Sequence, residues 1–436
     1  MKTKTVPVVS IILAVLFSGV LHLHSEIFSV TNANTSGDGS LLKAIADANG
    51  NPGKDKIVFN ISGNPPFIIM PTNNLPDLLQ PVEIDATTQP GFSNYPVVVL
   101  DGSLAGTNAN GITLSGGNSL LKGFAINNFK QNGLFINGGS SNIIQGNFIG
   151  TDITGRNSAS NWESGILIYN SSYNLIGGTN SYQMNLISGS NMYGIYIYSS
   201  NSINNTVIGN LIGVDITGTN QLGNSQHGIV IISCSSNTIG GSTVDKRNII
   251  SGNRGTGILI ADTGTKFNKV IGNFIGMDFT GTLIVSNELD GVYIYHCTDN
   301  QIGGVNQGEE NLISGNGQNG ITINNLSGGR NIIIGNLIGT DKSGSYSRGN
   351  SGNGIGILGT SNIIGGANLP ANLISGNYLN GIYISTNSTG NIVQGNIIGL
   401  DLSATRSVSN KVSGILIDNS PSNIIGGNIS NEGNII

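Results

Sequence analysis

Charged side chains are scarce in this sequence, and their scarcity excludes several classes of protein. Asp, Glu, Lys and Arg make up 9% of the 436 residues, whereas a typical soluble domain has about 25%. The 18 Lys and Arg against 23 Asp and Glu give a formal net charge of −5, so the basic surface that nucleic-acid binding requires is lacking. Amphipathic helices need a charged outer face and are not expected in number. The hydrophobic content of 38% still allows a buried core.

Long hydrophobic runs are also lacking, except at the N-terminus. Two lysines among the first four residues precede an apolar stretch from Val6 to Leu21, which is typical of a secretory signal peptide. We expect residues 1–25 to be that signal peptide, cleaved near Ser25 or Glu26, with an uncleaved anchor as the alternative. The mature protein is then secreted or held at the cell surface and has no membrane span.

Cysteine is nearly absent, with only two residues in the chain. Cys234 and Cys297 are 63 residues apart and occupy equivalent places in the repeat described next. Equivalent places two coils apart are separated by about 10 Å, beyond the roughly 7 Å limit for a disulfide. We expect the two thiols to be unbonded to each other.

Glycine, in contrast, is abundant, with 66 residues, about twice the usual share. Five copies of the motif Gly-Asn-apolar-Ile-Gly-x-Asp are 63, 63, 63 and 60 residues apart. A second motif, Gly-apolar-x-apolar, recurs at spacings that alternate between about 29 and 34 residues. Such periods indicate a solenoid or a similar array, here with two coils in each 63-residue period. The copies of the first motif begin at Gly146, Gly209, Gly272, Gly335 and Gly395.

Each coil contains three short strand patterns. In the coil from Gly194 they occupy residues 195–197, 205–208 and 211–212. Such runs of β-branched residues, bounded by Gly and Asn, are too short for helices and favour strands and turns. The sequence therefore predicts an all-β fold, a right-handed parallel β-helix with three-strand coils of about 29 and 34 residues, whose successive strands lie about 4.8 Å apart.

One Asn recurs in every coil, at intervals of 29 to 32 residues. Stacked in register, such side chains can donate and accept hydrogen bonds along a ladder without any charge. We interpret this set as structural. It consists of Asn142, Asn174, Asn205, Asn237, Asn268, Asn300, Asn331, Asn362, Asn391 and Asn423.

Residues 39–48 carry the one helix pattern, with Ser40 as N-cap. A solenoid needs a cap on its first coil, so residues 26–60 are expected to form an N-terminal cap with a helix near 40–48. Residues 61–436 are expected to form the β-helix, truncated at the C-terminus because the last coil lacks the Ser-Gly-Asn continuation of the earlier ones. The predicted apolar stripe of the helix is Leu41, Leu42, Ile45 and Ala46.

Two N-terminal stretches resemble motifs of a known group. The segment from Phe28 to Asn49 and the segment Ile84-Asp-Ala-Thr-Thr-Gln-Pro-Gly91 are similar to those of bacterial secreted or surface right-handed parallel β-helix repeat proteins, a pectate-lyase-like group. The repeated Ile-Gly-x-Asp-x-Thr-Gly is similar too. The resemblance covers nearly all of the mature chain and implies the fold rather than an activity. The group often has Cys and Arg where this chain has Ser40 and Lys43.

Neither a metal nor a cofactor is expected. One Asp recurs in each copy of the long motif, but copies two coils apart lie about 10 Å from each other, too far to share one Ca²⁺. Each is followed by a short polar turn, which favours an Asx turn. The lone Gly-x-Gly-x-x-Gly at 315–320 precedes a strand pattern rather than a helix, so it is no dinucleotide motif. The Asp residues are Asp152, Asp215, Asp278, Asp341 and Asp401.

The best candidates for catalysis are Asp262 and His296, with Glu288 and Asp290 nearby. Asp262 and His296 each follow the Gly of adjacent coils by five residues, so their Cα atoms are expected about 5 Å apart. A carboxylate beside an imidazole can support general acid–base chemistry. The pair occurs once and has no Lys or Arg at equivalent positions in neighbouring coils, so we favour a surface hydrogen bond.

Tyrosines on the first strand of the coils are the candidate ligand-binding residues. Residues two and four places after each Gly are expected to face outward. Ordinary β propensity is the alternative explanation for tyrosine there. The candidates are Tyr169, Tyr196, Tyr198, Tyr293, Tyr295 and Tyr383.

We therefore expect a secreted or cell-surface binding or adhesion module, with a glycan or cell-surface polysaccharide as partner and without catalysis. The alternative is an enzyme, a polysaccharide lyase, hydrolase or epimerase of the pectate-lyase-like group. A passive structural stalk is a third reading. The sequence does not indicate how the protein would be attached to a surface.

Overall fold

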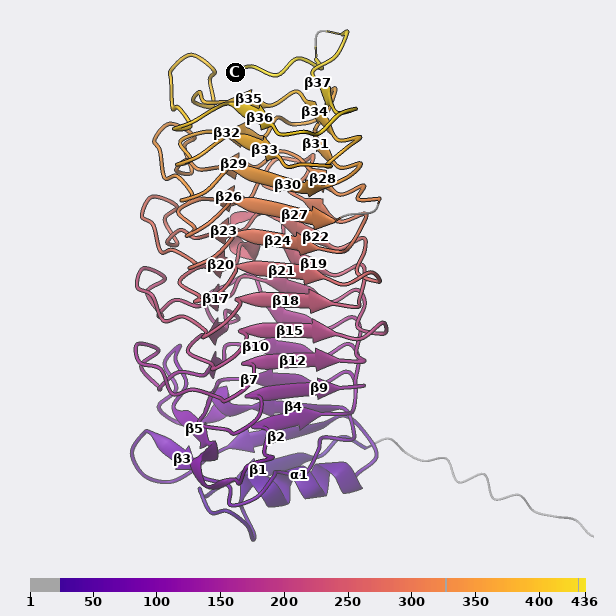
Figure 1. The fold of residues 1–436 in the computed structure, drawn as a ribbon. Coiled ribbons are helices and arrows are strands. Elements are labelled where there is room, and N and C mark those ends of the chain that lie inside the picture. Colours follow the sequence, from indigo (N-terminus) through magenta and orange to yellow (C-terminus); the bar gives the residue numbers. More distant parts are fainter. Residues whose placement is uncertain (1–23, 326–327, 430) are drawn as a thin grey trace, which may run out of the picture.

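The computed structural model describes residues 24–325, 328–429 and 431–436. The expected signal peptide, residues 1–25, lies almost wholly outside these ranges. From residue 27 to residue 425 the chain winds into one elongated stack of parallel strands, from the indigo end to the yellow end of Figure 1.

Three parallel sheets, named sheets A, B and C here, run along the stack. Sheet A has 14 strands: β1 (Ile27–Val30), β2 (Asp55–Phe59), β4 (Val82–Asp85), β7 (Leu120–Lys122), β10 (Ile143–Gln145), β13 (Leu175–Gly177), β16 (Thr206–Ile208), β19 (Thr238–Gly240), β22 (Lys269–Ile271), β25 (Gln301–Ile302), β28 (Ile332–Ile333), β31 (Ile363–Gly365), β34 (Ile392–Gln394) and β37 (Ile424–Ile425). Sheet B has 12 strands: β3 (Phe67–Ile69), β5 (Val98–Asp101), β8 (Phe124–Asn127), β11 (Phe148–Ile149), β14 (Leu186–Ile187), β17 (Leu211–Ile212), β20 (Ile249–Ile250), β23 (Phe274–Ile275), β26 (Leu312–Ile313), β29 (Leu337–Ile338), β32 (Leu373–Ile374) and β35 (Ile397–Ile398). Sheet C has 11 strands: β6 (Ile112–Leu114), β9 (Leu134–Asn137), β12 (Ile166–Tyr169), β15 (Ile195–Tyr198), β18 (Ile229–Ile232), β21 (Ile258–Ala261), β24 (Val292–Tyr295), β27 (Ile321–Asn325), β30 (Ile355–Gly359), β33 (Ile382–Ile384) and β36 (Ile415–Ile417).

Each full coil passes through sheet C, then sheet A, then sheet B. The chain runs from β15 through β16 and β17 and enters sheet C again at β18, which pairs with β15 in parallel. This order confirms the predicted coil of three strands. β1 and β2 already belong to sheet A, so the first strands of the stack lie within residues 26–60.

The core forms because side chains along each strand point alternately into and out of the stack. Ile195 and Ile197 of β15 are fully buried, whereas Tyr196 between them is only half-buried. The strands above and below align Ile with Ile, so that columns of isoleucine fill the inside of the stack. Complete burial of one such side chain contributes about 1.5–3 kcal/mol, which is why an uncharged repeat can hold so long a fold.

The predicted asparagine ladder is confirmed at the corner between sheets C and A. Asn237 is typical of it, because its backbone N and its Nδ2 both donate to Oδ1 of Asn268, at 2.9 and 3.1 Å, and Nδ2 also donates to the Ser202 carbonyl. The same bonds link every predicted member from Asn142 to Asn423.

Two further asparagine ladders occupy the other two corners. The one between sheets A and B consists of Asn147, Asn185, Asn210, Asn248, Asn273, Asn311, Asn336, Asn372, Asn396 and Asn434. The one between sheets B and C consists of Asn224, Asn253, Asn287, Asn316, Asn350, Asn377 and Asn410. Each corner of the coil is thus closed by a ladder of amides.

Loops that project from every second coil explain the 63-residue period. They lie above one another on the left of Figure 1, and each is closed by one antiparallel bridge, such as Met277 with Ile284. Neighbouring loops are also bonded directly, because the Phe279 N–H donates to the Gly218 carbonyl at 3.1 Å. They pack on an apolar layer outside sheet B that includes Leu211 and Phe274. We call residues 152–157, 215–220, 278–283, 341–346 and 401–406 the loop stack.

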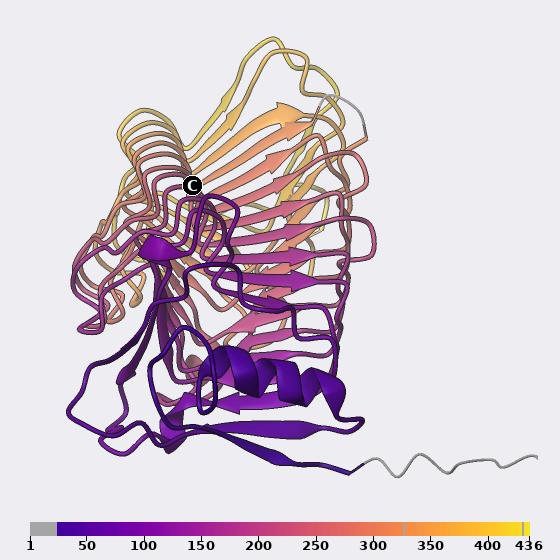
Figure 2. The ribbon, with the colours of Figure 1, turned by 90° about the horizontal axis from the view of Figure 1, so that it is seen from below.

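One α-helix, α1 (Leu41–Gly50), lies beside β1 and β2 at the N-terminal end of the stack (Figure 2). Ser40 caps it as predicted, since its Oγ accepts a hydrogen bond from the Lys43 N–H. The predicted stripe was wrong in part, because Ala46 is exposed. The buried positions follow the 3.6-residue period more closely and are Leu41, Ala44, Ile45 and Ala48. None of the described helices is long and apolar enough to cross a lipid bilayer.

Both cysteines are free and buried. Cys234 follows β18 and Cys297 follows β24, with β21 between these strands. The thiols contact different carbonyls, those of Ile197 and Ile260, which agrees with the predicted separation by two coils. Burial raises the pKa of each thiol to about 12.

Candidate functional site

The predicted tyrosines lie on the outer face of sheet C. The strand register aligns Tyr196 with Leu167 on one side and Val230 on the other, and Tyr198 with Tyr169. Tyr169 and Tyr198 are each 39% exposed, so their rings are available to a ligand. The rigid strands beneath hold these side chains at fixed spacing.

Four tyrosines and one histidine form a continuous group of rings on this face. The centroids of Tyr169 and Tyr198 are 5.7 Å apart and those of Tyr196 and Tyr198 are 5.5 Å apart, both in stacked geometry. Tyr193 meets Tyr196 edge-on at 5.3 Å and stacks on His227 at 5.7 Å. We call Tyr169, Tyr193, Tyr196, Tyr198 and His227 the aromatic cluster.

Two members of the aromatic cluster were missed by sequence reasoning. Tyr193 and His227 each directly precede the Gly that starts a sheet C strand. That position was not compared between coils, although in other coils it also holds polar residues such as Asp290 and Asn319. The residue directly before each of these glycines is therefore the place in the repeat from which both could have been predicted.

Ionisation in the aromatic cluster is suppressed by burial. It raises the pKa of Tyr196 to about 12 and also raises that of Tyr193. Burial lowers the pKa of His227, whose Nδ1 accepts a hydrogen bond from the Thr256 N–H at 3.0 Å. At neutral pH the cluster therefore presents uncharged rings and tyrosine hydroxyls that can donate and accept.

The remaining candidate tyrosines lie apart from the cluster. Tyr293 and Tyr295 contact each other with centroids 5.8 Å apart, and the Tyr293 hydroxyl accepts a hydrogen bond from Asn324. Two strands, β18 and β21, lie between this pair and β15. Tyr383 is farther along, where its hydroxyl donates to Asp418 at 3.2 Å. The tyrosines thus form separate groups rather than one stripe.

The side chains of the candidate catalytic residues do not meet at one place. Asp262 and His296 are neighbours in adjacent coils, with the Asp262 N–H donating to the Tyr295 carbonyl at 3.0 Å. The Asp262 carboxylate, however, accepts from Ser233 Oγ at 2.7 Å, and the His296 ring packs on Tyr295 at 4.1 Å. In the part of the chain that the structure describes, no hydrogen bond joins the Asp262 and His296 side chains.

Asp290 and Glu288 differ from each other in burial. Glu288 is exposed. Asp290 is buried, and burial raises its pKa even though its Oδ1 accepts from Thr322 Oγ1 at 2.7 Å and from the Asn319 N–H at 3.1 Å. Burial of Asp290 thus favours its protonated form.

The aspartates of the loop stack close their own turns. Oδ1 of Asp278 accepts from the N–H groups of Thr282 and Leu283 at 3.0 and 2.9 Å, and Asp215 does the same within its loop. These bonds reach backbone N–H groups four and five residues on, a wider span than the two residues of the predicted Asx turn. Among residues 24–325, 328–429 and 431–436, no group of three His, Cys, Asp or Glu residues is arranged to hold a metal ion.

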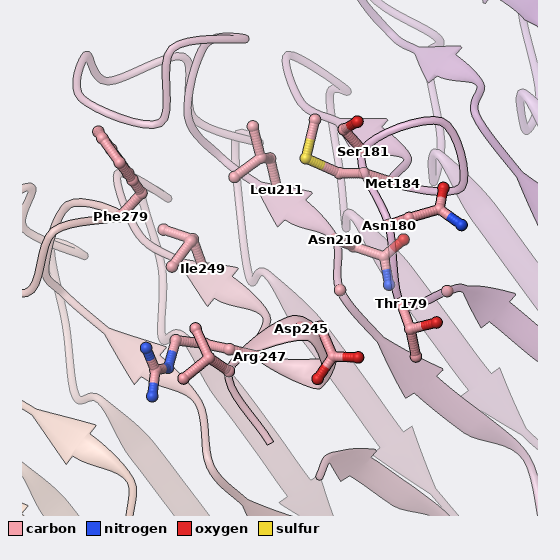
Figure 3. Close-up of a pocket in the computed structure, with 13 residues that line it drawn as sticks. Thr179, Asn180, Ser181, Met184, Asn210, Leu211, Asp245, Arg247, Ile249 and Phe279 are labelled. Atoms are coloured by element: carbon pink, nitrogen blue, oxygen red, sulfur yellow. The ribbon is translucent and has the colours of Figure 1, made fainter. Parts of the chain in front are cut away.

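A pocket of about 350 Å³ lies outside sheet B (Figure 3). Leu211, Ile249 and Met184 give it an apolar lining, with Phe279 of the loop stack at one side. The guanidinium of Arg247 lies over the Phe274 ring at 3.9 Å and so is already engaged. The pocket can accept an apolar group, but it does not bring together an acid and a base.

Comparisons with known proteins give structural likeness alone. No family model matches the sequence, and no curated protein matches it. A mutant of the periplasmic alginate epimerase AlgG is similar in structure, with a TM-score of 0.50 and 16% identity over 85% of this chain and 76% of that one. The Dettilon tailspike protein gives a TM-score of 0.53 and 18% identity over 89% of this chain and 68% of that one. With its three long parallel sheets, the chain is a right-handed parallel β-helix protein.

Proposed function

We propose that the mature protein is an exported β-helix module that binds a neutral glycan on the outer face of sheet C, without catalysis. The aromatic cluster carries this proposal. Tyrosine rings stack on the apolar faces of sugars while their hydroxyls reach sugar oxygens, and they lose little side-chain entropy on binding. The two solved structures named above, an alginate epimerase and a tailspike protein, carry the same fold.

The charge of the cluster supports a neutral ligand. Its members are four tyrosines and one histidine, and burial raises the pKa of Tyr196 to about 12 and lowers that of His227. Tyr193, Tyr196 and Tyr198 follow one another along one chain segment, and Tyr169 and His227 extend the rings to the adjacent coils. The centroids of Tyr193 and Tyr198 lie 5.3 and 5.5 Å from that of Tyr196, so these three rings together span at most about 11 Å, enough for a short glycan segment.

A binding comparison tests this proposal. Tyr196→Ala removes the ring that contacts both Tyr193 and Tyr198, so we expect retention on a neutral-glycan array to fall at least tenfold. The melting temperature should change little, because Tyr196 lies outside the isoleucine columns. Tyr378→Ala is the matched control, since Tyr378 is 58% exposed and lies outside the cluster. Equal retention by parent and Tyr196→Ala, or no retention by the parent, would refute the proposal.

The second candidate function is that of a polysaccharide lyase, hydrolase or epimerase. The buried carboxyl of Asp290 on the sheet C side favours it, since a raised pKa suits a general acid. Product formation from a polysaccharide panel that is lost in Asp290→Asn would support this candidate over binding alone.

Export of the protein is part of the proposal and rests on the N-terminal sequence. Mass spectrometry of protein secreted from a bacterial host should find a mature N-terminus near Ser25 or Glu26. An intact N-terminus on cell-associated protein would instead support an uncleaved anchor.

A further inference from the structure

The corner between sheets C and A has an unusual backbone at every coil. The residue just before each member of the first asparagine ladder has a left-handed conformation, with φ between 45 and 70°. Gly and Asn adopt this conformation most readily, whereas bulky side chains rarely do. The corner residues are Ser141, Tyr173, Asn204, Ser236, Phe267, Asp299, Arg330, Ser361, Gly390 and Ser422.

Phe267 is, with Tyr173, one of two aromatic residues at these corners, where bulky side chains are least expected. Its φ is 59°, and its side chain is 55% exposed. Burial of the ring therefore contributes little free energy to offset the unfavourable backbone conformation. Residues that adopt an unfavourable backbone conformation without gaining stability from packing are commonly found at binding sites.

The Phe267 ring borders a pocket of about 270 Å³ that spans three consecutive coils. Phe267 and Asp299 belong to adjacent coils, joined by a hydrogen bond from the Phe267 N–H to the Asp299 carbonyl at 3.0 Å. Arg330 occupies the same corner one coil further on. Lys269 of β22 and Gln301 of β25 complete the polar lining.

Positive charge gathers around this pocket in a chain that has little charge. Arg330 donates to both oxygens of Asp299, from Nε at 2.7 Å and from Nη2 at 2.6 Å. Lys266 Nζ lies 5.5 Å from the centroid of the Phe267 ring, and Lys269 lines the pocket. The Glu309 carboxylate interacts electrostatically with Lys269, and it accepts a hydrogen bond from Asn306 Nδ2 of its own loop. The positive charges are those of Lys266, Lys269 and Arg330. The two carboxylates nearby, Asp299 and Glu309, both already accept hydrogen bonds.

We propose that this corner pocket binds an anionic sugar. The carboxylate or sulfate of the sugar faces Lys269 and Arg330, and an apolar sugar face lies on the Phe267 ring. Arg330 is suited to this role because it is 65% exposed and already oriented by Asp299. The pocket lies outside the aromatic cluster and binds an anionic rather than a neutral sugar, so it is a second site beyond the function proposed above.

Calorimetry with defined hexasaccharides tests the proposal. The probes are a hyaluronan hexamer, which carries carboxylates only, a keratan sulfate hexamer, which carries sulfates only, and a carboxyl-reduced hyaluronan hexamer, which is neutral. We expect at least one anionic hexamer to bind and the neutral one to bind at least tenfold more weakly. Binding should also weaken between 0.05 and 0.5 M NaCl, because exposed charges are screened.

Two variants locate the site, and a third serves as control. Phe267→Asn removes the ring but suits the left-handed corner, so it should weaken binding at least tenfold while the melting temperature stays level or rises. Lys269→Gln should weaken binding and flatten its salt dependence. Tyr173→Asn makes the same kind of change at the corner three coils away and should leave binding unchanged, as should Tyr196→Ala.

Three results would overturn the proposal. They are the failure of both anionic hexamers to bind, equal binding of the neutral hexamer, and full binding by Phe267→Asn. All three are measured in the Tyr196→Ala background, in which the aromatic cluster lacks its central ring, so they are distinguishable from failure of the neutral-glycan function.

Discussion

At the scale of the residue, one asparagine serves three coils at once. Nδ2 of Asn273 donates to Oδ1 of Asn311 and to the carbonyls of Ile239 and Ile271, at 2.9 to 3.1 Å, while its Oδ1 accepts from Asn248. Corners interrupt the hydrogen bonding of the strands, yet buried backbone groups must still be paired. The amide is suited to this task because it both donates and accepts without charge.

Removal of one such amide should be costly. Asn273→Ala leaves buried carbonyls and a neighbouring amide without a partner, at about 1–3 kcal/mol for each unpaired group, so we expect a loss of about 3 kcal/mol in the free energy of unfolding. Asn201→Ala is the control, because Asn201 is exposed and surface changes usually stay within about 0.5 kcal/mol. Urea denaturation measures both. Similar values for the two variants would show that the ladder adds no stability.

At the scale of the element, each loop of the loop stack depends on one carboxylate. Burial of Asp278 acts to raise its pKa, but hydrogen bonds from Thr280, Leu283 and Thr282 outweigh that effect and the pKa is lowered. The pKa of Asp215 is lowered in the same way. A carboxyl whose folded pKa is depressed stabilises the fold above its unfolded pKa, near 3.9, and this stability is lost as the pH falls through the folded pKa.

Asp278→Ala should therefore loosen one loop and reduce acid sensitivity. Loss of these charge-assisted bonds is expected to lower the free energy of unfolding by about 1–2 kcal/mol at pH 7, and the difference from the parent should shrink as the pH falls below 4. Thermal unfolding between pH 2.5 and 7 measures it. Asp38→Ala, in which an exposed carboxylate outside the loop stack is lost, is the control. A difference that stays constant down to pH 2.5 would contradict this account.

Elements were more predictable than the contacts between their side chains. The sheet C strands follow a Gly-apolar-x-apolar pattern, so a regular period placed them and one asparagine ladder correctly. The ladder through Asn210, Asn248 and Asn273 was missed because its spacing alternates between 38 and 25 residues. Tyr193 and His227 occupy equivalent places in adjacent coils, so the repeat aligns them, whereas the edge-on contact of Tyr193 with Tyr196 depends on side-chain rotamers, which a repeat spacing does not specify. The corner pocket at Phe267 likewise depends on three coils together.

At the scale of the whole molecule, the fold is held by apolar columns and amide ladders, with charge confined to a few places. The hydrophobic core runs without interruption from Val30 to Ile398. Within the described ranges, ion pairs form one small network near the N-terminal end and three separate pairs. The network joins Lys56 and Lys122 to Glu83 and Asp85, and the pairs are Lys43 with Asp47, Arg330 with Asp299, and Arg406 with Asp401.

Stability should accordingly respond little to ionic strength. Partly exposed ion pairs contribute about 0–1 kcal/mol each and are screened by salt, while apolar burial and uncharged amide ladders are not. In a protein of this length a change of 1 kcal/mol moves the melting temperature by only about 2 °C, so we expect a shift of less than about 4 °C between 0.02 and 0.3 M NaCl at pH 7. The same titration of hexasaccharide affinity at the Phe267 corner should show a strong salt dependence, because there the cations act on the ligand directly. A large fall in melting temperature with salt would mean that the few charges hold the stack together, and the amide ladders would then be secondary to them.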